Sequence, residues 1–470
     1  MGFRFWDFKK SIHFGIDPSL IISQSRLSNV DCRLLPVVCT IASLMRIYCS
    51  GTGGIGLSAY AALQKANGHE VHGSDRTESD ILDSLREQGI SVALNQDGTF
   101  IPEDADLFVF SEAIPKDSPE RKRADELGIR SITYFQALGE ISRDHTVIAV
   151  CGTHGKSSTV AMAARVLIEL GMDPTVIAGT KLKELNNSNW KKGKGEYFLL
   201  EACEYRRSFL NISPNIILMT NADGDHFDAF DSVEDYQEAF VEFIQCLSVN
   251  GIVVTHMEDK DCANIVRKTK KEVYAVDQFT LPDLNVPGKH MKMNAQLVLG
   301  LAGVLGIPEE EALESLKGYS GCWRRMEVLG NLDNGVTVID DYAHHPLEIK
   351  ATVQAMLEGY PNRRLVAVFQ PHMHDRTLKL YDEFIKSFGG IDILVLTDVY
   401  DARHDVEKES VDMEKFASDI KEGSQIDVLY GKNLNCTQSM LKNDILKPDD
   451  VLLIMGAGDV TDMARSMVSE

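Results

Sequence analysis

A lysine and a serine stand at the start of a predicted helix, directly after a turn that contains two glycines. The string, which follows the β-branched strand 146–150, reads Gly152-Thr153-His154-Gly155-Lys156-Ser157-Ser158. Backbone N–H groups of such a turn point at phosphate oxygens, and the positive end of the helix dipole adds to the attraction. Lys156 would neutralise terminal phosphates, and the Ser157 hydroxyl would hold Mg²⁺. Val150 replaces the first glycine of the strict phosphate-loop pattern, so the prediction of phosphate binding depends on the flanking strand and helix.

Two further side chains lie where a metal beside these phosphates would be bound. Glu201 ends the buried strand 197–200, and His226 follows the buried strand 216–220 in an acidic segment. The carboxyl ends of parallel strands are where α/β proteins place their sites. Mg²⁺ prefers oxygen ligands, so Glu201 fits readily and an imidazole is less expected. His226 taken alone is equally well explained as a loop histidine bonded to its neighbours.

Two polar clusters close successive strands in the last third of the chain. The first is Asp340-Asp341-Tyr342-Ala343-His344-His345-Pro346, and the second is Gln370-Pro371-His372-Met373-His374-Asp375-Arg376-Thr377. Either cluster alone could be an ordinary loop, but two at the carboxyl ends of successive strands of one sheet indicate a site. The pair Arg324-Arg325 precedes them, and adjacent arginines are more often a solvated surface than a site.

A glycine turn also lies near the start of the chain. Strand 46–50 runs into Gly51-Thr52-Gly53-Gly54-Ile55-Gly56, then a helix and a strand that ends at Asp75. This order is the first unit of a Rossmann-like sheet, and Asp75 could take a ribose hydroxyl. The turn alone suits a nicotinamide nucleotide or a sugar nucleotide. A dehydrogenase, however, would not explain the second turn that carries Lys156.

The elements that position these residues form three α/β units with mostly parallel sheets. We expect an N-terminal Rossmann-like domain, a central phosphate-loop ATPase domain and a C-terminal Rossmann-like domain. The predicted boundaries are an extension of unknown role at 1–45, followed by domains at 46–143, 144–323 and 324–470. The predicted strands are 46–50, 70–73, 107–110, 129–133, 146–150, 197–200, 216–220, 251–255, 336–340, 364–369, 393–398 and 451–455. The polar stretch 181–195 is predicted to be a loop.

Composition limits the class of protein. The 470 residues would suit about three domains at roughly 150 residues each. Lys plus Arg number 48 against 70 Asp plus Glu, a formal charge of −22 that argues against a nucleic-acid partner. The nine cysteines lack CxxC spacing, so we expect neither zinc nor disulfides but a reducing cytoplasm. No segment approaches the ~20 apolar residues of a membrane span, so no membrane insertion is expected.

Taken together, the strings resemble the Mur ligase family, the ATP-dependent amide-bond ligases of peptidoglycan precursor synthesis. They occur in the family's order over about residues 46 to 470 and are most similar to the branch that joins alanine to UDP-N-acetylmuramate. The remaining matching strings are Ser111-Glu112-Ala113-Ile114-Pro115, Glu201-Ala202-Cys203-Glu204 and Met455-Gly456-Ala457-Gly458-Asp459.

The resemblance implies the cofactors ATP and Mg²⁺, the substrates UDP-N-acetylmuramate and L-alanine, and an acyl-phosphate intermediate. The implied ATP-binding residues are Gly152, Thr153, His154, Gly155, Lys156, Ser157, Ser158, Asn294, Arg325 and Asp341, with Asp340 as the alternative to Asp341. The implied metal ligands are Ser157, Glu201 and His226. The UDP substrate would contact Gly51, Gly53, Gly54, Gly56 and Asp75. The implied catalytic residues are Lys156, His344, His345, His372 and Arg376, and any of the three histidines could accept the amine proton.

This sequence departs from the family pattern in places. Met291 stands where the family has an asparagine near adenine, and Val241 stands where several branches have a carbamylated lysine. Residues 1–45 have no counterpart, and we expect them to be dispensable. Two alternatives stay open: a ligase that joins a tripeptide to the same acceptor, and a non-catalytic nucleotide-binding homologue. For a catalytic protein, we expect Lys156→Ala to leave folding intact and to remove turnover.

Overall fold

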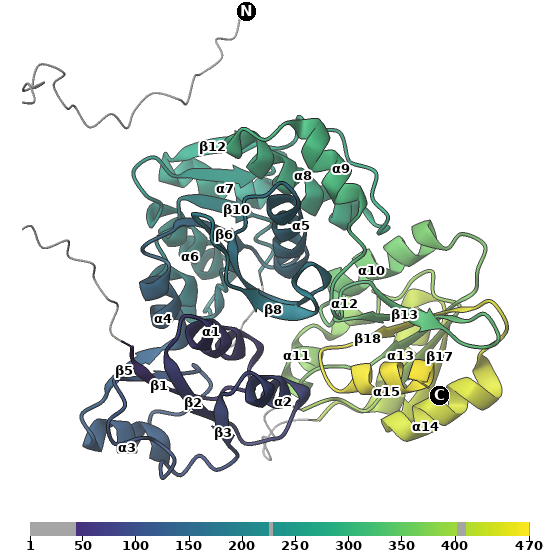
Figure 1. Ribbon diagram of the computed structural model, residues 1–470. Helices are drawn as coiled ribbons and strands as arrows, with labels where there is room; N and C mark the ends of the chain where they lie inside the picture. The colour runs from purple at the N-terminus through teal and green to yellow at the C-terminus, as the bar shows by residue number, and fades with distance from the viewer. Residues whose placement is uncertain (1–43, 225–228, 402–409, 470) are drawn as a thin grey trace, which may run out of the picture. The chain divides into compact units, whose positions relative to one another are not determined.

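The computed structural model describes residues 44–224, 229–401 and 410–469. In these residues the chain forms three β-sheets in chain order, each alternating with helices (Figure 1). The architecture is the predicted three-domain α/β fold with mostly parallel strands. Of the predicted extension 1–45, only Leu44 and Met45 are among the described residues.

The first sheet has five parallel strands in the order β3-β2-β1-β4-β5. Its strands are β1 (Arg46–Ser50), β2 (Glu70–Ser74), β3 (Ser91–Ala93), β4 (Leu107–Phe110) and β5 (Arg130–Thr133). Its helices are α1 (Ile55–Ala66), α2 (Asp80–Glu87), α3 (Pro119–Glu126) and α4 (Tyr134–Ile141). Strand β3 was not predicted, because its three residues are only partly buried or exposed and form no apolar run.

The second sheet has the order β12-β11-β10-β6-β9-β7-β8. Its strands are β6 (Thr146–Cys151), β7 (Thr175–Leu182), β8 (Ser188–Lys191), β9 (Tyr197–Glu201), β10 (Ile216–Met219), β11 (Ile252–Thr255) and β12 (Glu272–Ala275). Its helices are α5 (Lys156–Glu169), α6 (Val233–Gln245), α7 (Lys260–Thr269), α8 (Lys289–Leu305) and α9 (Glu309–Lys317), with short 3₁₀ segments at Lys183–Leu185 and Tyr205–Asn211.

The prediction of a loop at 181–195 was wrong in part. Strand β7 continues to Leu182, and β8 pairs with it in the antiparallel direction at the edge of the sheet. All four residues of β8 are half-buried and most are polar, so an edge strand here leaves no apolar run in the sequence. Asn189 of β8 donates a 3.1 Å hydrogen bond to the hydroxyl of Ser58 in α1, which links the second sheet to the first domain.

The third sheet has the order β13-β14-β18-β15-β16-β17, with only β13 antiparallel to its neighbour. Its strands are β13 (Glu327–Asn331), β14 (Thr337–Asp341), β15 (Leu365–Phe369), β16 (Ile393–Thr397), β17 (Asp427–Lys432) and β18 (Val451–Met455). Its helices are α10 (Pro346–Gly359), α11 (His374–Lys379), α12 (Tyr381–Phe384), α13 (Met413–Ser424), α14 (Leu434–Met440) and α15 (Val460–Ser469), with a π-helical turn at Leu441–Ile445.

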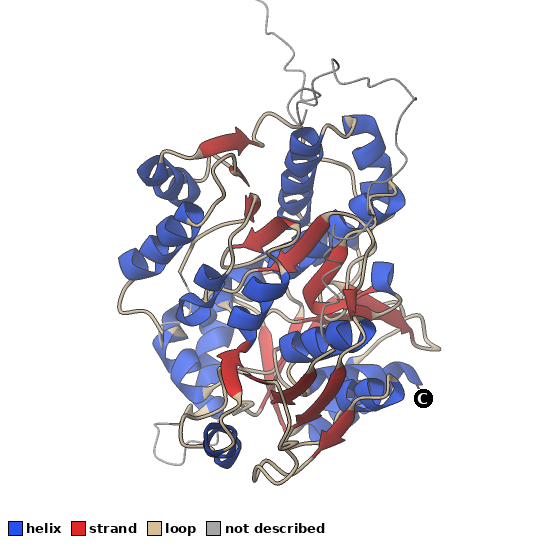
Figure 2. Cartoon of the chain, turned by 60° about the vertical axis from the view of Figure 1, so that its left-hand side comes forward, coloured by secondary structure: helices blue, strands red, loops and turns tan. Residues whose placement is uncertain are grey.

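The central strands are buried on both faces. Every residue of β4, β10, β14, β15 and β18 is buried, and helices cover the strands in Figure 2. Continuous apolar runs are typical of parallel strands covered by helices on both sides, which is why these strands were recognisable in the sequence. None of the helices in the described part of the chain combines the length and the apolar composition that a membrane span requires.

Candidate active site

The phosphate-loop candidate joins β6 to α5, and its two glycines are demanded by close packing. Gly152 has φ +134°, and a Cβ there would lie 2.0 Å from Oγ1 of Thr220. Gly155 has φ +82°, and a Cβ there would lie 2.7 Å from Oδ1 of Asn294. Both positions therefore exclude a side chain for steric reasons as well as conformational ones. Asn294, predicted to bind ATP, thus packs directly on the loop.

Residues directly after β10 form hydrogen bonds with the backbone of the loop. The N–H of His154 donates to Oδ1 of Asn221 at 2.9 Å, and the Thr220 hydroxyl donates to the carbonyl of His154 at 2.6 Å. The hydroxyl of Thr153 lies 2.9 Å from the Tyr236 hydroxyl in the protein interior. The Thr153 side chain therefore packs into the second domain, and its backbone N–H donates to the carbonyl of Asn221 at 3.2 Å.

Lys156 points back into the protein in this structure. Its ammonium donates to the carbonyl of Thr153 and to Oε1 of Glu204, both at 3.0 Å, and the Glu204 side chain has no exposed surface. Burial lowers the pKa of Lys156, but Glu204 and the other acidic neighbours Cys203 and Glu201 together outweigh that effect and raise the pKa. The lysine is a cation already positioned beside the loop.

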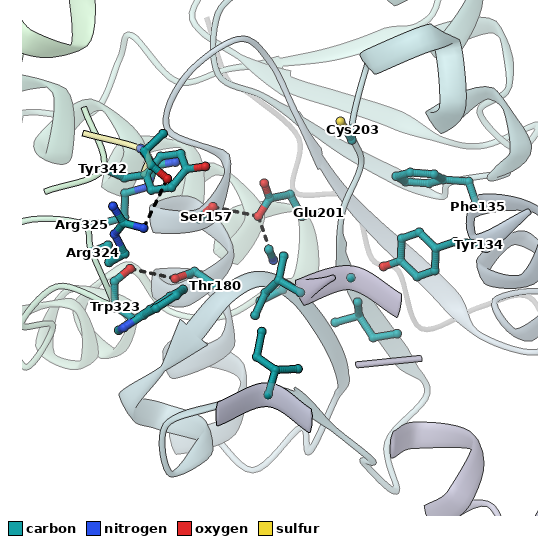
Figure 3. Close-up of a pocket in the computed structure, with 17 residues that line it drawn as sticks. Tyr134, Phe135, Ser157, Thr180, Glu201, Cys203, Trp323, Arg324, Arg325 and Tyr342 are labelled. Carbon is teal, nitrogen blue, oxygen red and sulfur yellow. Dashed lines mark hydrogen bonds between the residues drawn. The ribbon is translucent and has the colours of Figure 1, made fainter. Parts of the chain in front are cut away.

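Ser157 and Glu201 lie side by side, as Figure 3 shows. The Ser157 hydroxyl donates to Oε2 of Glu201 at 2.9 Å, and the N–H of Gly179 donates to the same oxygen at 3.1 Å. Pairing of β6 with β9 places Val150 opposite Glu201, so the carboxylate is brought to the loop by strand register. The two adjacent oxygen atoms of Ser157 and Glu201 are suitable ligands for a Mg²⁺ ion that completes its coordination shell with phosphate oxygens and water. The third predicted ligand, His226, lies outside the described residues.

Asp340 and Asp341 end β14 and point to opposite faces, as successive strand residues must. Asp341 accepts hydrogen bonds from the N–H groups of Met326 (2.8 Å) and Ala343 (2.9 Å), and it lines a cavity beside the phosphate loop. Asp340 instead accepts a 2.6 Å hydrogen bond from the Thr461 hydroxyl in α15. Burial raises the pKa of Asp340 to about 6. Of the two candidates, Asp341 is therefore the one that faces the site.

The adjacent residues Arg324 and Arg325 also point in different directions. Arg324 is buried and donates to the carbonyls of Gly456 (2.5 Å) and Gly458 (2.9 Å), in the turn after β18. The guanidinium of Arg325 lies 4.8 Å from the Tyr342 ring centre, and its Nη1 lies 3.7 Å from Oε1 of Glu348. Arg324 therefore anchors the turn while it borders the larger cavity, and Arg325 lines both cavities of the predicted site.

Two cavities meet at this site. The first has a volume of 510 Å³ and is lined from all three domains, by residues that include Gly56, Tyr134, Ser157, Glu201, Arg325 and Tyr342 (Figure 3). The second has a volume of 320 Å³ and is lined by residues that include Ser158, His290, Met291, Asn294, Arg325 and Asp341. Ser157 and Arg325 line both cavities. The two cavities are therefore neighbours, and these two side chains border both of them.

The first glycine turn is fixed by Asp75. The N–H of Gly53 donates to Oδ2 of Asp75 at 2.7 Å, and a Cβ on Gly53 would lie 2.7 Å from the same oxygen. A Cβ on Gly56 would lie 2.8 Å from the Tyr134 ring, and Gly51 has φ +89°. Gly54 is the N-cap residue of α1. The carboxylate of Asp75 is thus bound to the turn that it was predicted to assist.

The predicted catalytic histidines gather at the start of α10 and α11. The ring of His345 lies 5.2 Å from that of His154, and the ring of His344 lies 5.9 Å from that of His372, measured between centroids. His372 stacks on Tyr400 at 5.9 Å, and Arg376 follows in α11. In the described part of the chain, His344, His345, His372 and Arg376 line neither of the two cavities.

Sequence reasoning missed Glu348. Its carboxylate lies 3.1 Å from Nδ1 of His154 and 3.2 Å from Nδ1 of His344. The available signal was a Glu three residues after the helix-capping position, with Pro346 at the first helical position. That pattern predicts a capping box, which the structure contains, but it does not predict the contact with a loop 194 residues away.

Known proteins match the chain over most of its length. Residues 46–146 match the catalytic domain of the Mur ligase family, residues 150–296 its middle domain, and residues 324–458 the glutamate ligase domain. The UDP-N-acetylmuramate–L-alanine ligase of Persephonella marina is 37% identical, over 88% of this chain and 94% of the relative.

Solved structures show the same similarity. The crystal structure of the UDP-N-acetylmuramate–alanine ligase of Thermotoga maritima matches with a TM-score of 0.75 and 29% identity, over 90% of this chain and 98% of the other. A murein peptide ligase of Psychrobacter arcticus matches with a TM-score of 0.68 and 20% identity, over 90% of this chain and 98% of the other, which is a likeness of fold.

Proposed function

The chain belongs to the Mur ligase family, and from this premise we propose that it joins L-alanine to UDP-N-acetylmuramate with ATP, in peptidoglycan precursor synthesis. The observation that carries the proposal is the shared lining of the two cavities by Ser157 and Arg325. The cavity with Asn294 and Asp341 suits the nucleotide. The cavity that reaches the first glycine turn suits the UDP-sugar acid.

The reaction needs an activated carboxylate. A carboxylate is a poor electrophile at neutral pH, so its attack on the γ-phosphate of ATP gives an acyl phosphate and ADP. The alanine amine then forms the amide bond, and inorganic phosphate leaves. Phosphoryl transfer of this kind depends on positioning and on cations that stabilise the transferring group. Lys156, at the start of α5, and Arg325, which lines both cavities, are the cations placed for this task.

We also propose a Mg²⁺ ion, which would neutralise the phosphate charge when bound. Ser157 and Glu201 would hold it, because their oxygens lie 2.9 Å apart beside the phosphate loop. His226 stays a predicted third ligand. Glu201→Ala should raise the Mg²⁺ concentration needed for half-maximal activity, and Glu196→Ala, exposed at the opposite end of β9, is the control. The metal assignment would fail if both variants respond to Mg²⁺ alike.

The cysteines in the described part of the chain bear on the compartment in which the protein works. Cys49, Cys151, Cys203, Cys246, Cys262, Cys322 and Cys436 are all free thiols. Free thiols are usual in reducing compartments, so we propose that the protein works in the cytoplasm, which also supplies ATP.

Coupled measurement of ADP release tests the function. With UDP-N-acetylmuramate, ATP and Mg²⁺, we expect ADP release that requires L-alanine and yields the amide. A UDP-sugar that lacks a carboxylate is the control, and it should support no release. Preference for a tripeptide over alanine would contradict the proposal in favour of a peptide ligase. No release with either amine would identify a non-catalytic homologue.

A further inference from the structure

The Glu348 carboxylate connects the phosphate loop with the histidine cluster of the third domain. Its Oε1 lies 3.1 Å from Nδ1 of His154, and its Oε2 lies 3.2 Å from Nδ1 of His344. Oε2 also accepts hydrogen bonds from the backbone N–H groups of His344 (3.0 Å) and His345 (3.3 Å). The side chain is 12% exposed. Its position is therefore determined from both domains at once.

The hydrogen bonds of His344 determine which ring nitrogen carries the proton. Nδ1 of His344 lies 3.0 Å from the carbonyl of Tyr342 and 3.2 Å from the carboxylate of Glu348. Both neighbours are acceptors, so Nδ1 must carry the hydrogen. In the neutral ring, Nε2 then has the free electron pair. The ring lies edge-on to Tyr342, whose side chain lines the larger cavity, with centroids 5.2 Å apart.

His345 has the opposite arrangement. Its Nδ1 accepts a 3.3 Å hydrogen bond from the N–H of Leu347 and so caps α10. The proton of the neutral ring must therefore be on Nε2, which cannot accept another one. A proton acceptor at His345 would require the loss of the helix cap. Between these two neighbours, the structure favours His344.

We propose that Glu348 is a positioning residue that holds His344 in the Nδ1–H form, so that Nε2 of His344 accepts the proton of the attacking amine. This inference depends on the proposed ligase function and adds to it the identity of the base and its orienting group. In the step, the ammonium of alanine gives one proton to Nε2, and the nitrogen electron pair forms the bond to the acyl carbon. The C–O bond to phosphate breaks, and inorganic phosphate leaves with the electron pair. The phosphate also takes the second proton that the nitrogen must lose to become an amide.

The charges around Glu348 support an ionised carboxylate. Burial raises its pKa, but His344 and His154 outweigh that effect and hold the pKa well below its usual range. The guanidinium of Arg325 is a permanently charged neighbour, with Nη1 3.7 Å from Oε1 of Glu348. Asp341 of the third domain and His290 of the second also interact with Glu348 electrostatically. His345 contacts Glu348, and Tyr342 and His372 flank His344. Lys156 and Asp223 act on His154 from the second domain.

Hydroxylamine separates this role from a structural one. It is uncharged at neutral pH and attacks an acyl phosphate without a base, so it reports acyl-phosphate formation alone. Glu348→Gln keeps the size of the side chain but removes its charge. His344→Asn keeps a donor near the Nδ1 position but lacks Nε2. Glu358→Gln, exposed at the other end of α10, is the control with the same change of charge.

We expect Glu348→Gln and His344→Asn to slow amide formation with alanine by about 100-fold, the lower end of what a positioned base contributes. Hydroxamate formation should stay near the wild-type rate, and Glu358→Gln should resemble wild type in both reactions. The loss of amide-formation rate in the two variants should become smaller as pH rises, because solvent then removes the amine proton.

Three results would overturn the inference. Equal losses with both nucleophiles would make Glu348 a structural or closure residue. An undiminished alanine reaction in either variant would exclude the pair from proton transfer. Failure of the wild-type enzyme with both nucleophiles would contradict the proposed function itself, and this inference with it.

Discussion

The ammonium of Lys156 donates a 3.0 Å hydrogen bond to Glu204, a carboxylate with no exposed surface. The sequence alone predicts a lysine whose removal leaves the fold intact, but this ion pair changes the expectation. Removing one partner of a buried pair leaves the other charge uncompensated.

We therefore expect Lys156→Ala to abolish turnover and also to lower the free energy of unfolding by about 3 kcal/mol. The double variant Lys156→Ala/Glu204→Gln should regain most of that stability in urea titrations but no turnover. If the single variant is as stable as wild type, the pair contributes nothing to the fold.

The neighbouring Arg324 and Arg325 should respond differently to the same substitution. Arg324→Lys loses hydrogen bonds to the carbonyls of Gly456 and Gly458, so unfolding should become easier by about 1–3 kcal/mol. Arg325→Lys alters the cation shared by both cavities, so kcat should fall by about 100-fold with little change in melting temperature. Thermal melts and steady-state rates of both variants test these two expectations. A stability loss in Arg325→Lys together with a kcat loss in Arg324→Lys would contradict the roles assigned to the two arginines.

Asp75 should affect the UDP substrate without affecting ATP. Its two oxygens accept from the N–H groups of Gly53 and Arg76, both at 2.7 Å, so Asp75→Asn leaves one N–H without its acceptor. We expect the KM for the UDP substrate to rise about tenfold and the KM for ATP to stay unchanged. Asp125→Asn, exposed on α3, is the control in the same domain. A matching rise in both KM values would show a general loss of structure instead.

Asp340 should make stability depend on pH. Burial raises its pKa to about 6 from an ordinary value of 3.8, so the folded protein binds this proton more tightly than the unfolded chain. The stabilisation from this group is complete below pH 3.8 and is lost as pH rises through about 6. At 1.36 kcal/mol per unit, the loss is about 3 kcal/mol.

We therefore expect Asp340→Asn to gain stability relative to wild type as the pH rises from about 4 to about 7, as measured by urea unfolding at each pH. Asp333→Asn, in the turn between β13 and β14, is a control. A stability difference that does not change with pH would show that Asp340 has an ordinary pKa in the folded protein.

The sequence by itself determined where the chemistry lies along the chain and which fold carries it. A strand, a glycine turn and a helix are contiguous, so the phosphate-loop candidate at 152–158 and the glycine turn at 51–56 could be recognised from local patterns. Parallel strands covered on both faces leave continuous apolar runs, so most strands were predicted within one or two residues. Polar clusters directly after those runs then had to meet at one edge of a sheet.

Only the tertiary structure decided which side chains meet. Glu204 lies 48 residues from Lys156, and Glu348 lies 194 residues from His154, so no local pattern could pair them. Asp341 faces the smaller cavity, whereas Asp340 packs against α15, because successive strand residues point to opposite faces. Arg325 lines both cavities, whereas Arg324 lines only the larger one and donates to the turn after β18. The same holds for His344 and His345, whose hydrogen-bond partners give adjacent rings opposite proton positions.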